Sequence, residues 1–154
     1  MNLTRLRTHV QVAEGLSLVP YLDTVGVWTI GYGHALRGKM EHEIADLTWT
    51  KPQAETQLRD DIADAIHDAS TFPWFQSLDA VRQEVLVELA FNLGLTKLRK
   101  FVKMLAAIAV KDWHTAAQEL QQSRWYGQVG MRRGTRLVNA LRTGTWPVMR
   151  RRRV

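Results

Sequence analysis

Two carboxylates and a hydroxyl lie close together in the sequence, at Glu14, Asp23 and Thr29. Hydrolysis of a glycosidic bond needs an acid that protonates the departing oxygen and a carboxylate that activates water or attacks the sugar. Glu14 suits the acid, Asp23 suits the carboxylate, and the Thr29 hydroxyl can hold a water beside Asp23. Two acids and a threonine also occur together by chance, as a surface glutamate, a turn aspartate and a strand threonine, so the spacing alone does not establish this chemistry.

The residues before Glu14 predict a helix that ends at this acid. Apolar residues recur at helical spacing from about Leu3 to Glu14, Asn2 suits the N-cap, and Gly15 suits the C-terminal cap. The helix dipole disfavours negative charge at its C-terminal end. The end of the helix therefore suits Glu14 to the role of the acid.

The segment from Val19 to His34 has a different composition. It is rich in valine, isoleucine, tyrosine, tryptophan and threonine, and Gly26 interrupts it. The composition predicts a β-hairpin, with Asp23 near the turn and Thr29 on the returning strand. Residues 35–49 are predicted to form a loop or a short strand.

The remainder of the chain predicts helices. Thr50 and Gln53 form the pattern of a capping box, which starts a helix that runs to about Ala69. The polar surface of this helix is typical of one that bridges two lobes. Apolar stripes at helical spacing predict further helices over 78–93, 98–108, 113–120 and about 131–142.

Together these elements predict an α+β fold that is mostly helical, with a small β-hairpin lobe and a larger helical lobe joined by a long helix. We expect a single domain over residues 1–154. Its expected parts are a β-containing lobe at 15–50, the linking helix at 51–70, a helical lobe from 1–14 and 71–148, and a basic tail at 149–154.

The composition of the chain limits its chemistry. The chain has 154 residues, no cysteine and a formal net charge of +6, so disulfides and thiolate chemistry are excluded. No apolar run reaches the length of a membrane span, and the first residues lack the continuous apolar region of a signal peptide.

The charge is unevenly distributed along the sequence. No acidic residue follows Glu119, whereas nine arginines do: Arg124, Arg132, Arg133, Arg136, Arg142, Arg150, Arg151, Arg152 and Arg153. Such a basic end suits an anionic partner, for example a cell-wall polymer, a lipid headgroup or nucleic acid.

The spacing of Glu14, Asp23 and Thr29, followed by Gly31-Tyr32-Gly33-His34, resembles the catalytic face of the phage-type lysozyme (endolysin) family. Further segments match that family in the same order, which makes the resemblance specific over nearly the whole chain to about Pro147. They are Ser77-Leu78-Asp79-Ala80-Val81-Arg82, Ala90-Phe91-Asn92-Leu93-Gly94, Ser123-Arg124-Trp125-Tyr126 and Arg142-Thr143-Gly144-Thr145-Trp146.

The resemblance implies a lysozyme-like fold and a muramidase that hydrolyses the β-1,4 bond between N-acetylmuramic acid and N-acetylglucosamine in peptidoglycan. Glu14 would be the general acid, and Asp23, helped by Thr29, would place and activate the water. The resemblance also implies inversion at the anomeric carbon, for which the two carboxyl groups lie roughly 6.5–9.5 Å apart. Phe91 matches an aromatic residue at the cleft wall, and core packing is its alternative role.

Two polar relationships also follow from the resemblance. His34 matches a histidine that pairs with an aspartate of the linking helix, for which Asp61 is the best candidate, and we interpret this pair as structural. An arginine that faces the catalytic glutamate in the family corresponds to Arg132 or Arg133. A one-residue difference in length after Tyr126 leaves the choice between them open.

Other signals are weaker. His42-Glu43 resembles the start of the zinc motif H-E-x-x-H, but Asp46 stands where the second histidine is needed, so we expect no metal and no cofactor. Five of the six tryptophans are expected in the core or at the junction of the lobes, whereas Trp28 is ambiguous between a core residue and a sugar platform.

Peptidoglycan is the expected partner of a monomeric protein. The run from Arg150 to Arg153 is either a solvated tail or a segment attracted to anionic outer-membrane lipid. No nucleic-acid-binding module surrounds this charge, so nucleic acid is not expected. The resemblance implies synthesis in the host cytoplasm and release to the wall through a phage-encoded membrane pore.

Two alternative functions stay open. A lytic transglycosylase breaks the same bond without water, and it needs an acid/base glutamate but no water-placing residues, so Asp23 and Thr29 favour hydrolysis. A non-catalytic cationic protein that disrupts the wall or membrane would keep full lytic activity in a Glu14→Gln variant.

Overall fold

The computed structural model describes residues 1–148, which form two compact units. The first unit consists of residues 2–66, and the second consists of residues 67–148 together with Met1. The run from Arg150 to Arg153, on which the expected lipid contact depends, lies outside the described residues.

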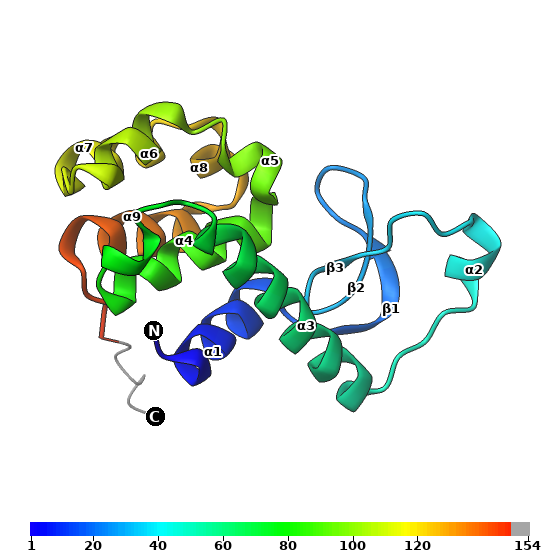
Figure 1. Cartoon of the computed structure of the whole chain (residues 1–154). Helices are drawn as coiled ribbons and strands as arrows, with labels where there is room; N and C mark the ends of the chain where they lie inside the picture. Colours follow the sequence, from blue (N-terminus) through cyan, green and yellow to red (C-terminus); the bar gives the residue numbers. More distant parts are fainter. Residues whose placement is uncertain (149–154) are drawn as a thin grey trace, which may run out of the picture. The chain divides into compact units, whose positions relative to one another are not determined.

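The first unit contains α1 (Leu3–Glu14), a three-stranded antiparallel sheet, α2 (Glu41–Ala45) and most of α3 (Lys51–Ser70), as Figure 1 shows. The sheet has the order β1 (Ser17–Leu22), β2 (Trp28–Gly31) and β3 (His34–Ala35). Helix α1 has the predicted bounds because both of its ends are determined locally. The Asn2 side chain accepts a hydrogen bond from the Arg5 N–H at 3.0 Å, and Gly15 follows the helix at a positive φ of 68°.

The register of the hairpin determines which side chains share a face. Tyr21 lies opposite Thr29, and Leu22 lies opposite Trp28. Successive side chains on a strand point to opposite faces of the sheet. Trp28 and Thr29 are neighbours on β2, so their side chains lie on opposite faces.

A small apolar core packs on the face of this sheet that carries the side chains of Trp28 and Ile30. It consists of Ile30, Leu36 and Ile44, with Leu47 and Trp49 packed against it. Ile44 belongs to α2, which corrects the prediction that residues 35–49 form only loop or short strand. This helix has five residues and is too short to show an apolar period in the sequence.

Helix α3 begins at the predicted capping box. The Thr50 N–H donates to Gln53 Oε1 at 2.8 Å, and the Gln53 N–H donates to Thr50 Oγ1 at 3.3 Å. The helix buries only a narrow stripe of mostly small residues, namely Ala54, Leu58, Ile62, Ala65 and Ala69. The prediction of an unusually polar helix from about residue 51 to residue 69 is therefore confirmed.

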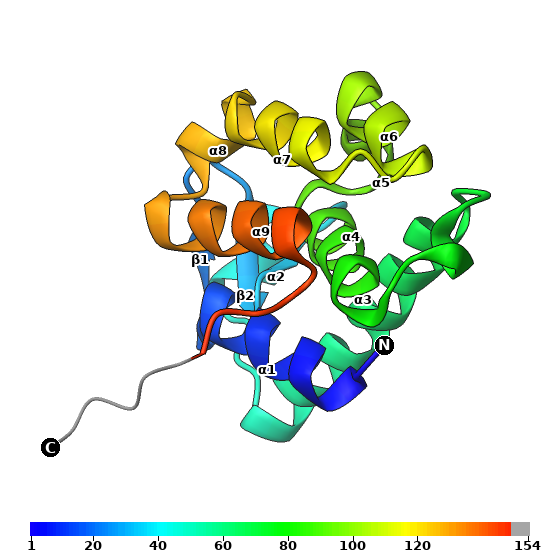
Figure 2. The same ribbon diagram turned by 90° about the vertical axis from the view of Figure 1, so that its left-hand side faces the viewer.

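The second unit is helical. It contains η1 (Phe75–Ser77), α4 (Ala80–Leu93), α5 (Leu95–Leu98), α6 (Val102–Ala109), α7 (Trp113–Gln121), α8 (Arg124–Gln128) and α9 (Met131–Thr143). Helix α9 packs on α4, α7 and α8, and α6 packs on α7. Figure 2 shows α4 and α9 side by side, with α6, α7 and α8 in a second layer over them.

One prediction about this unit was wrong, and one helix was missed. The single helix expected over residues 98–108 is two helices, because the chain leaves helical geometry at Phe101, where ψ is 57°. One apolar period continues across this break, so periodicity could not locate it. Helix α8 was not predicted, and its five residues, like those of α2, are too few for an apolar period.

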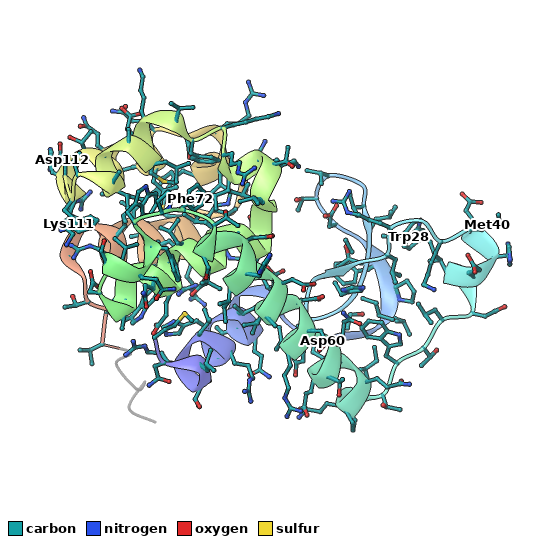
Figure 3. All side chains as sticks on the ribbon, in the orientation of Figure 1. Trp28, Met40, Asp60, Phe72, Lys111 and Asp112 are labelled. Carbon is teal, nitrogen blue, oxygen red and sulfur yellow. The ribbon has the colours of Figure 1, made fainter. Side chains whose placement is uncertain are left out.

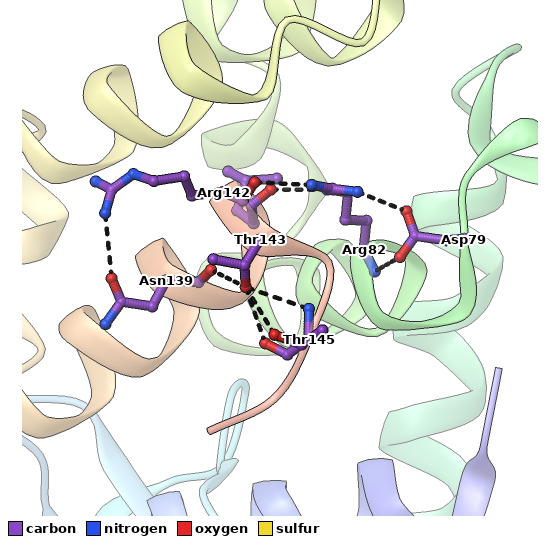
Figure 4. Close-up of polar contacts among 7 residues, drawn as sticks. Asp79, Arg82, Asn139, Arg142, Thr143 and Thr145 are labelled. Atoms are coloured by element: carbon purple, nitrogen blue, oxygen red, sulfur yellow. Dashed lines mark hydrogen bonds and ion pairs between the residues drawn. The ribbon is translucent and has the colours of Figure 1, made fainter. Parts of the chain in front are cut away.

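Arg82 ties α4 to the C-terminal end of α9 (Figure 4). Its Nε donates to the Leu141 carbonyl at 2.7 Å, and its Nη2 donates to the Arg142 carbonyl at 2.8 Å. The guanidinium also pairs with Asp79 at 3.1 Å. These bonds satisfy carbonyls that the end of a helix leaves without an intrahelical partner.

Candidate active site

Glu14 is the last residue of α1, and its side chain lies against the turn between β2 and β3. A Cβ atom added to Gly33 would lie 2.5 Å from Glu14 Oε2 and 2.7 Å from its Cδ. The backbone at Gly33 also has a φ of +75°, which residues with a Cβ rarely adopt. The second glycine of Gly31-Tyr32-Gly33-His34 therefore leaves the space that the Glu14 carboxylate occupies.

Asp23 follows β1 directly and is held by its own loop. Its Oδ1 accepts hydrogen bonds from the Val25 N–H at 2.9 Å and from the Val27 N–H at 2.8 Å. The Asp23 N–H donates in turn to the Val27 carbonyl at 2.9 Å. These three bonds fix the orientation of the carboxyl group, and among residues 1–148 no side chain or backbone group donates to its Oδ2.

Thr29 lies on β2, and only 4% of its surface is exposed. Its hydroxyl donates to the Val27 carbonyl at 2.9 Å. Because its one proton is used in this bond, the oxygen offers its lone pairs to a further donor. Asp23 and Thr29 are thus both bonded to Val27. Asp23 is bonded to the N–H and the carbonyl of Val27, and Thr29 is bonded to the carbonyl.

Tyr21 interacts electrostatically with Glu14 and Asp23, and it was not identified from the sequence. It pairs with Thr29 across the two strands. Burial raises the pKa of the Tyr21 phenol above its ordinary value, and the negative charges of Glu14 and then Asp23 raise it further. Both carboxylates therefore act on one phenol. Its position two residues before Asp23 on a predicted strand is a signal that could have placed it on the same face.

His34 and Asp61 lie together, as the resemblance implies. His34 Nδ1 is 2.8 Å from Asp61 Oδ2, and the Gln57 amide donates to Asp61 Oδ1 at 2.9 Å. The His34 ring also lies 5.7 Å from the Trp49 ring, measured between centroids. These contacts join β3 to α3 at the end of the turn that holds Gly33.

The remaining predicted residues belong to the second unit. Phe91 is half-buried on α4, near its C-terminal end. Arg132 and Arg133 lie in the first turn of α9, where Arg132 is exposed and Arg133 is half-buried. Their relation to Glu14 stays a prediction.

The described part of the chain holds no group of three or more histidine, aspartate or glutamate side chains that could bind a metal ion. Over the same residues, no helix is both long enough and apolar enough to cross a membrane.

Comparison with known proteins shows which family the chain matches. The phage lysozyme family matches residues 11–143. A protein of Dictyostelium discoideum named "Probable T4-type lysozyme 2" is 27% identical over 93% of this chain and 96% of its own length. The pre-baseplate central spike protein Gp5 of Enterobacteria phage T4 is 30% identical over 85% of this chain and 26% of its own length. An endolysin of Acyrthosiphon pisum secondary endosymbiont phage 1 is 32% identical over 71% of this chain and 70% of its own length.

The three-stranded antiparallel sheet and the helices are those of a lysozyme-like α+β fold, as the sequence predicted. The chain belongs to the phage lysozyme family. A glycosidase activity of the lysozyme type, with peptidoglycan as substrate, follows from this membership. The matched residues include Glu14, Asp23 and Thr29.

Proposed function

We propose that this lysozyme hydrolyses the β-1,4 bond between N-acetylmuramic acid and N-acetylglucosamine, and that it inverts the anomeric carbon. Glu14 is the general acid that protonates the departing oxygen. Asp23 is the base, and Thr29 positions the attacking water with it. The observation that carries this proposal is that Glu14 lies against the turn that follows β2, and that Asp23 and Thr29 are both bonded to Val27 at the start of the same strand.

The hydrogen bonds around Asp23 and Thr29 support the placement of a water. Thr29 donates its proton to the Val27 carbonyl, so a water beside it must donate to the hydroxyl oxygen. The second proton of that water is then available to Asp23 Oδ2, which accepts no hydrogen bond from a described residue. A water that donates both protons presents its lone pairs to the sugar, as attack on the anomeric carbon requires.

The surroundings of Glu14 support its role as the acid. The end of α1 and the space above Gly33 restrict where its carboxyl group can lie. A restricted position of the acid favours proton transfer to one glycosidic oxygen, because less ordering of the side chain is then needed. The contact of His34 with Asp61 is proposed to hold the adjoining turn in place rather than to touch the substrate.

We extend the proposal to the second unit and to the biological setting. Phe91 contributes to the wall of the substrate site, and either Arg132 or Arg133 faces Glu14. The protein acts as a monomeric endolysin that lyses the host wall after release from the cytoplasm, and its basic end contacts anionic outer-membrane lipid. These statements rest on the family and on the charge of the sequence.

Mass spectrometry of fragments released from purified peptidoglycan tests the bond and the use of water. Reducing muramic-acid ends are expected, and NMR of the first product formed should give the α-anomer of the new reducing end. Anhydro ends would identify a transglycosylase and remove the proposed roles of Asp23 and Thr29. A β-anomer would overturn inversion.

Matched variants test the roles of the residues. Glu14→Gln and Asp23→Asn are expected to lower the rate of hydrolysis by at least about 100-fold, as the loss of an acid or base usually does. Asp60→Asn makes the same chemical change at an exposed position of α3 and should retain activity. Full lysis by Glu14→Gln would instead favour a non-catalytic cationic mechanism.

A further inference from the structure

A hollow lies in the first unit, on the face of the sheet opposite to Thr29. Its volume is about 690 Å³, and its walls come from β1, β2 and the segment around α2, with Val19, Trp28 and Leu47 among the apolar lining residues. Trp28 lines this hollow, and its neighbour Thr29 points to the other face. In Figure 3 Trp28 lies beside the strands, on the side towards α2. The hollow is therefore separate from the candidate active site.

The charge of this hollow contrasts with that of the chain. The formal net charge is +6, yet the charged residues that line the hollow are the acids Glu41 and Asp46, and no lining residue is basic. Neither carboxylate makes a hydrogen bond or ion pair with another residue of the described part of the chain. The hollow is thus bordered by two carboxylates, with no basic residue in its lining, and by the side chain of Trp28.

Besides the two carboxylates and the aliphatic side chains, the hollow is lined by Trp28. Its indole is 37% exposed, although large aromatic side chains are usually well buried. An indole face attracts an ammonium group, and carboxylates beside it add to this attraction. The apolar wall suits the methylenes of an alkyl chain that carries such a group.

We propose that this hollow binds an alkylammonium group, such as the side-chain amine of a peptide. An anionic group would be repelled by Glu41 and Asp46, and a neutral sugar would make no use of two negative charges. Within the substrate of the proposed function, on which this assignment of the ligand rests, the amines belong to the peptide stems and not to the glycan. The hollow would then bind a peptide stem on the face away from the bond that is cleaved.

NMR titration with Nα-acetyl-lysine methylamide tests this inference without any measurement of hydrolysis. The amine is expected to shift the indole resonance of Trp28, which is assigned by its loss in Trp28→Phe. The same compound acetylated at Nζ lacks the positive charge and should bind at least about tenfold more weakly. Equal shifts with both compounds would overturn the proposal, as would the absence of shifts with the amine.

A charge-matched pair of variants locates the site. The double variant Glu41→Gln/Asp46→Asn should weaken binding of the amine at least about tenfold. Asp60→Asn/Asp64→Asn makes the same change in net charge on the exposed face of α3, where Figure 3 labels Asp60, and should bind as the parent protein does. Equal weakening in both variants would show non-specific charge attraction and overturn the site.

Chitotriose distinguishes the main alternative occupant. If the trisaccharide shifts the Trp28 resonance and the amine does not, the hollow is a glycan site and the proposal is wrong. Because binding is measured on the parent protein with small probes, a failure here leaves the glycosidase assignment intact. A failure of the glycosidase assignment likewise leaves the binding result intact.

Discussion

The α-carbon of Gly33 lies directly against the carboxylate of Glu14, so that a methyl group at position 33 would occupy the place of that carboxylate. Gly38 has the same φ of +75°, but nothing lies within 4 Å of an added Cβ there. Substitutions at the two glycines therefore distinguish two effects. Both positions need a left-handed backbone, but only Gly33 also needs space beside the Glu14 carboxylate.

The first prediction compares Gly33→Ala with Gly38→Ala. Both should lower the free energy of unfolding by about 1 kcal/mol, because alanine is strained at this φ. The flexible end of Glu14 can move aside in Gly33→Ala, and such a displacement should lower activity on the order of 100-fold. Chemical unfolding and hydrolysis of peptidoglycan measure the two effects. Full activity in Gly33→Ala would contradict this account of the acid.

The second prediction concerns the titration of Tyr21. Burial, then Glu14 and then Asp23 raise the pKa of its phenol above 10.0, so it should ionise after an unhindered tyrosine in a spectrophotometric titration. Glu14→Gln should lower this pKa while leaving it above 10.0, because burial is the main cause. An unchanged titration in both Glu14→Gln and Asp23→Asn would mean that the carboxylates are not near the phenol.

The same shift affects stability at alkaline pH. A pKa raised in the folded state contributes stability that is fully present below the unfolded pKa and is lost as the pH rises through the folded pKa. The parent protein should therefore lose stability above about pH 10 more steeply than Tyr21→Phe does. Unfolding experiments at a series of alkaline pH values give the comparison.

The third prediction concerns Lys111, which has a φ of 59° although it is not glycine (Figure 3). It ends α6 in a Schellman motif, with the Lys111 N–H bonded to the Ile108 carbonyl and the Asp112 N–H bonded to the Ala107 carbonyl. Lys111→Gly should raise the free energy of unfolding by roughly 0.5–1 kcal/mol, because glycine adopts this conformation without steric cost. Lys103→Gly, inside α6, should lower it.

The fourth prediction concerns the bonds of Arg82 to α9. Arg82→Ala removes two charge-assisted bonds and leaves the Leu141 and Arg142 carbonyls without these donors, so it should cost about 3 kcal/mol of unfolding free energy. Arg142→Ala removes the same charge at an exposed position bonded to Asn139 and should cost less than about 1 kcal/mol. Equal losses would show that net charge, and not the carbonyl contacts, determines the effect.

Features that depend on neighbouring residues could be predicted from the sequence. The bounds of α1 follow from Asn2 and Gly15, and the start of α3 follows from the reciprocal bonds of Thr50 and Gln53. Such caps involve residues only a few positions apart, so they can be predicted from a single sequence. The hairpin was recognisable for a similar reason, since composition and turn residues mark it locally.

Several features that depend on distant residues could not be predicted, although the resemblance did indicate the contact of His34 with Asp61. Nothing near Gly33 in the sequence indicates that its missing side chain leaves space for Glu14, nineteen positions earlier. Tyr21 was missed because its importance arises from the register of β1 with β2, which brings it opposite Thr29. The break at Phe101 was missed because a stripe of apolar residues indicates which side chains are buried. It does not indicate whether one continuous helix carries them.

The Arg82 bonds also bear on when this protein can finish folding during translation. The carbonyls that Arg82 contacts lie 59 and 60 residues further along the chain. A nascent chain that has exposed α4 to solvent therefore still lacks the partners of this arginine until residue 142 has left the ribosome. At roughly 5–20 residues per second, Arg82 waits several seconds for them. During that interval the side chains of α4 that pack on α9 are also uncovered, so they can contact other chains.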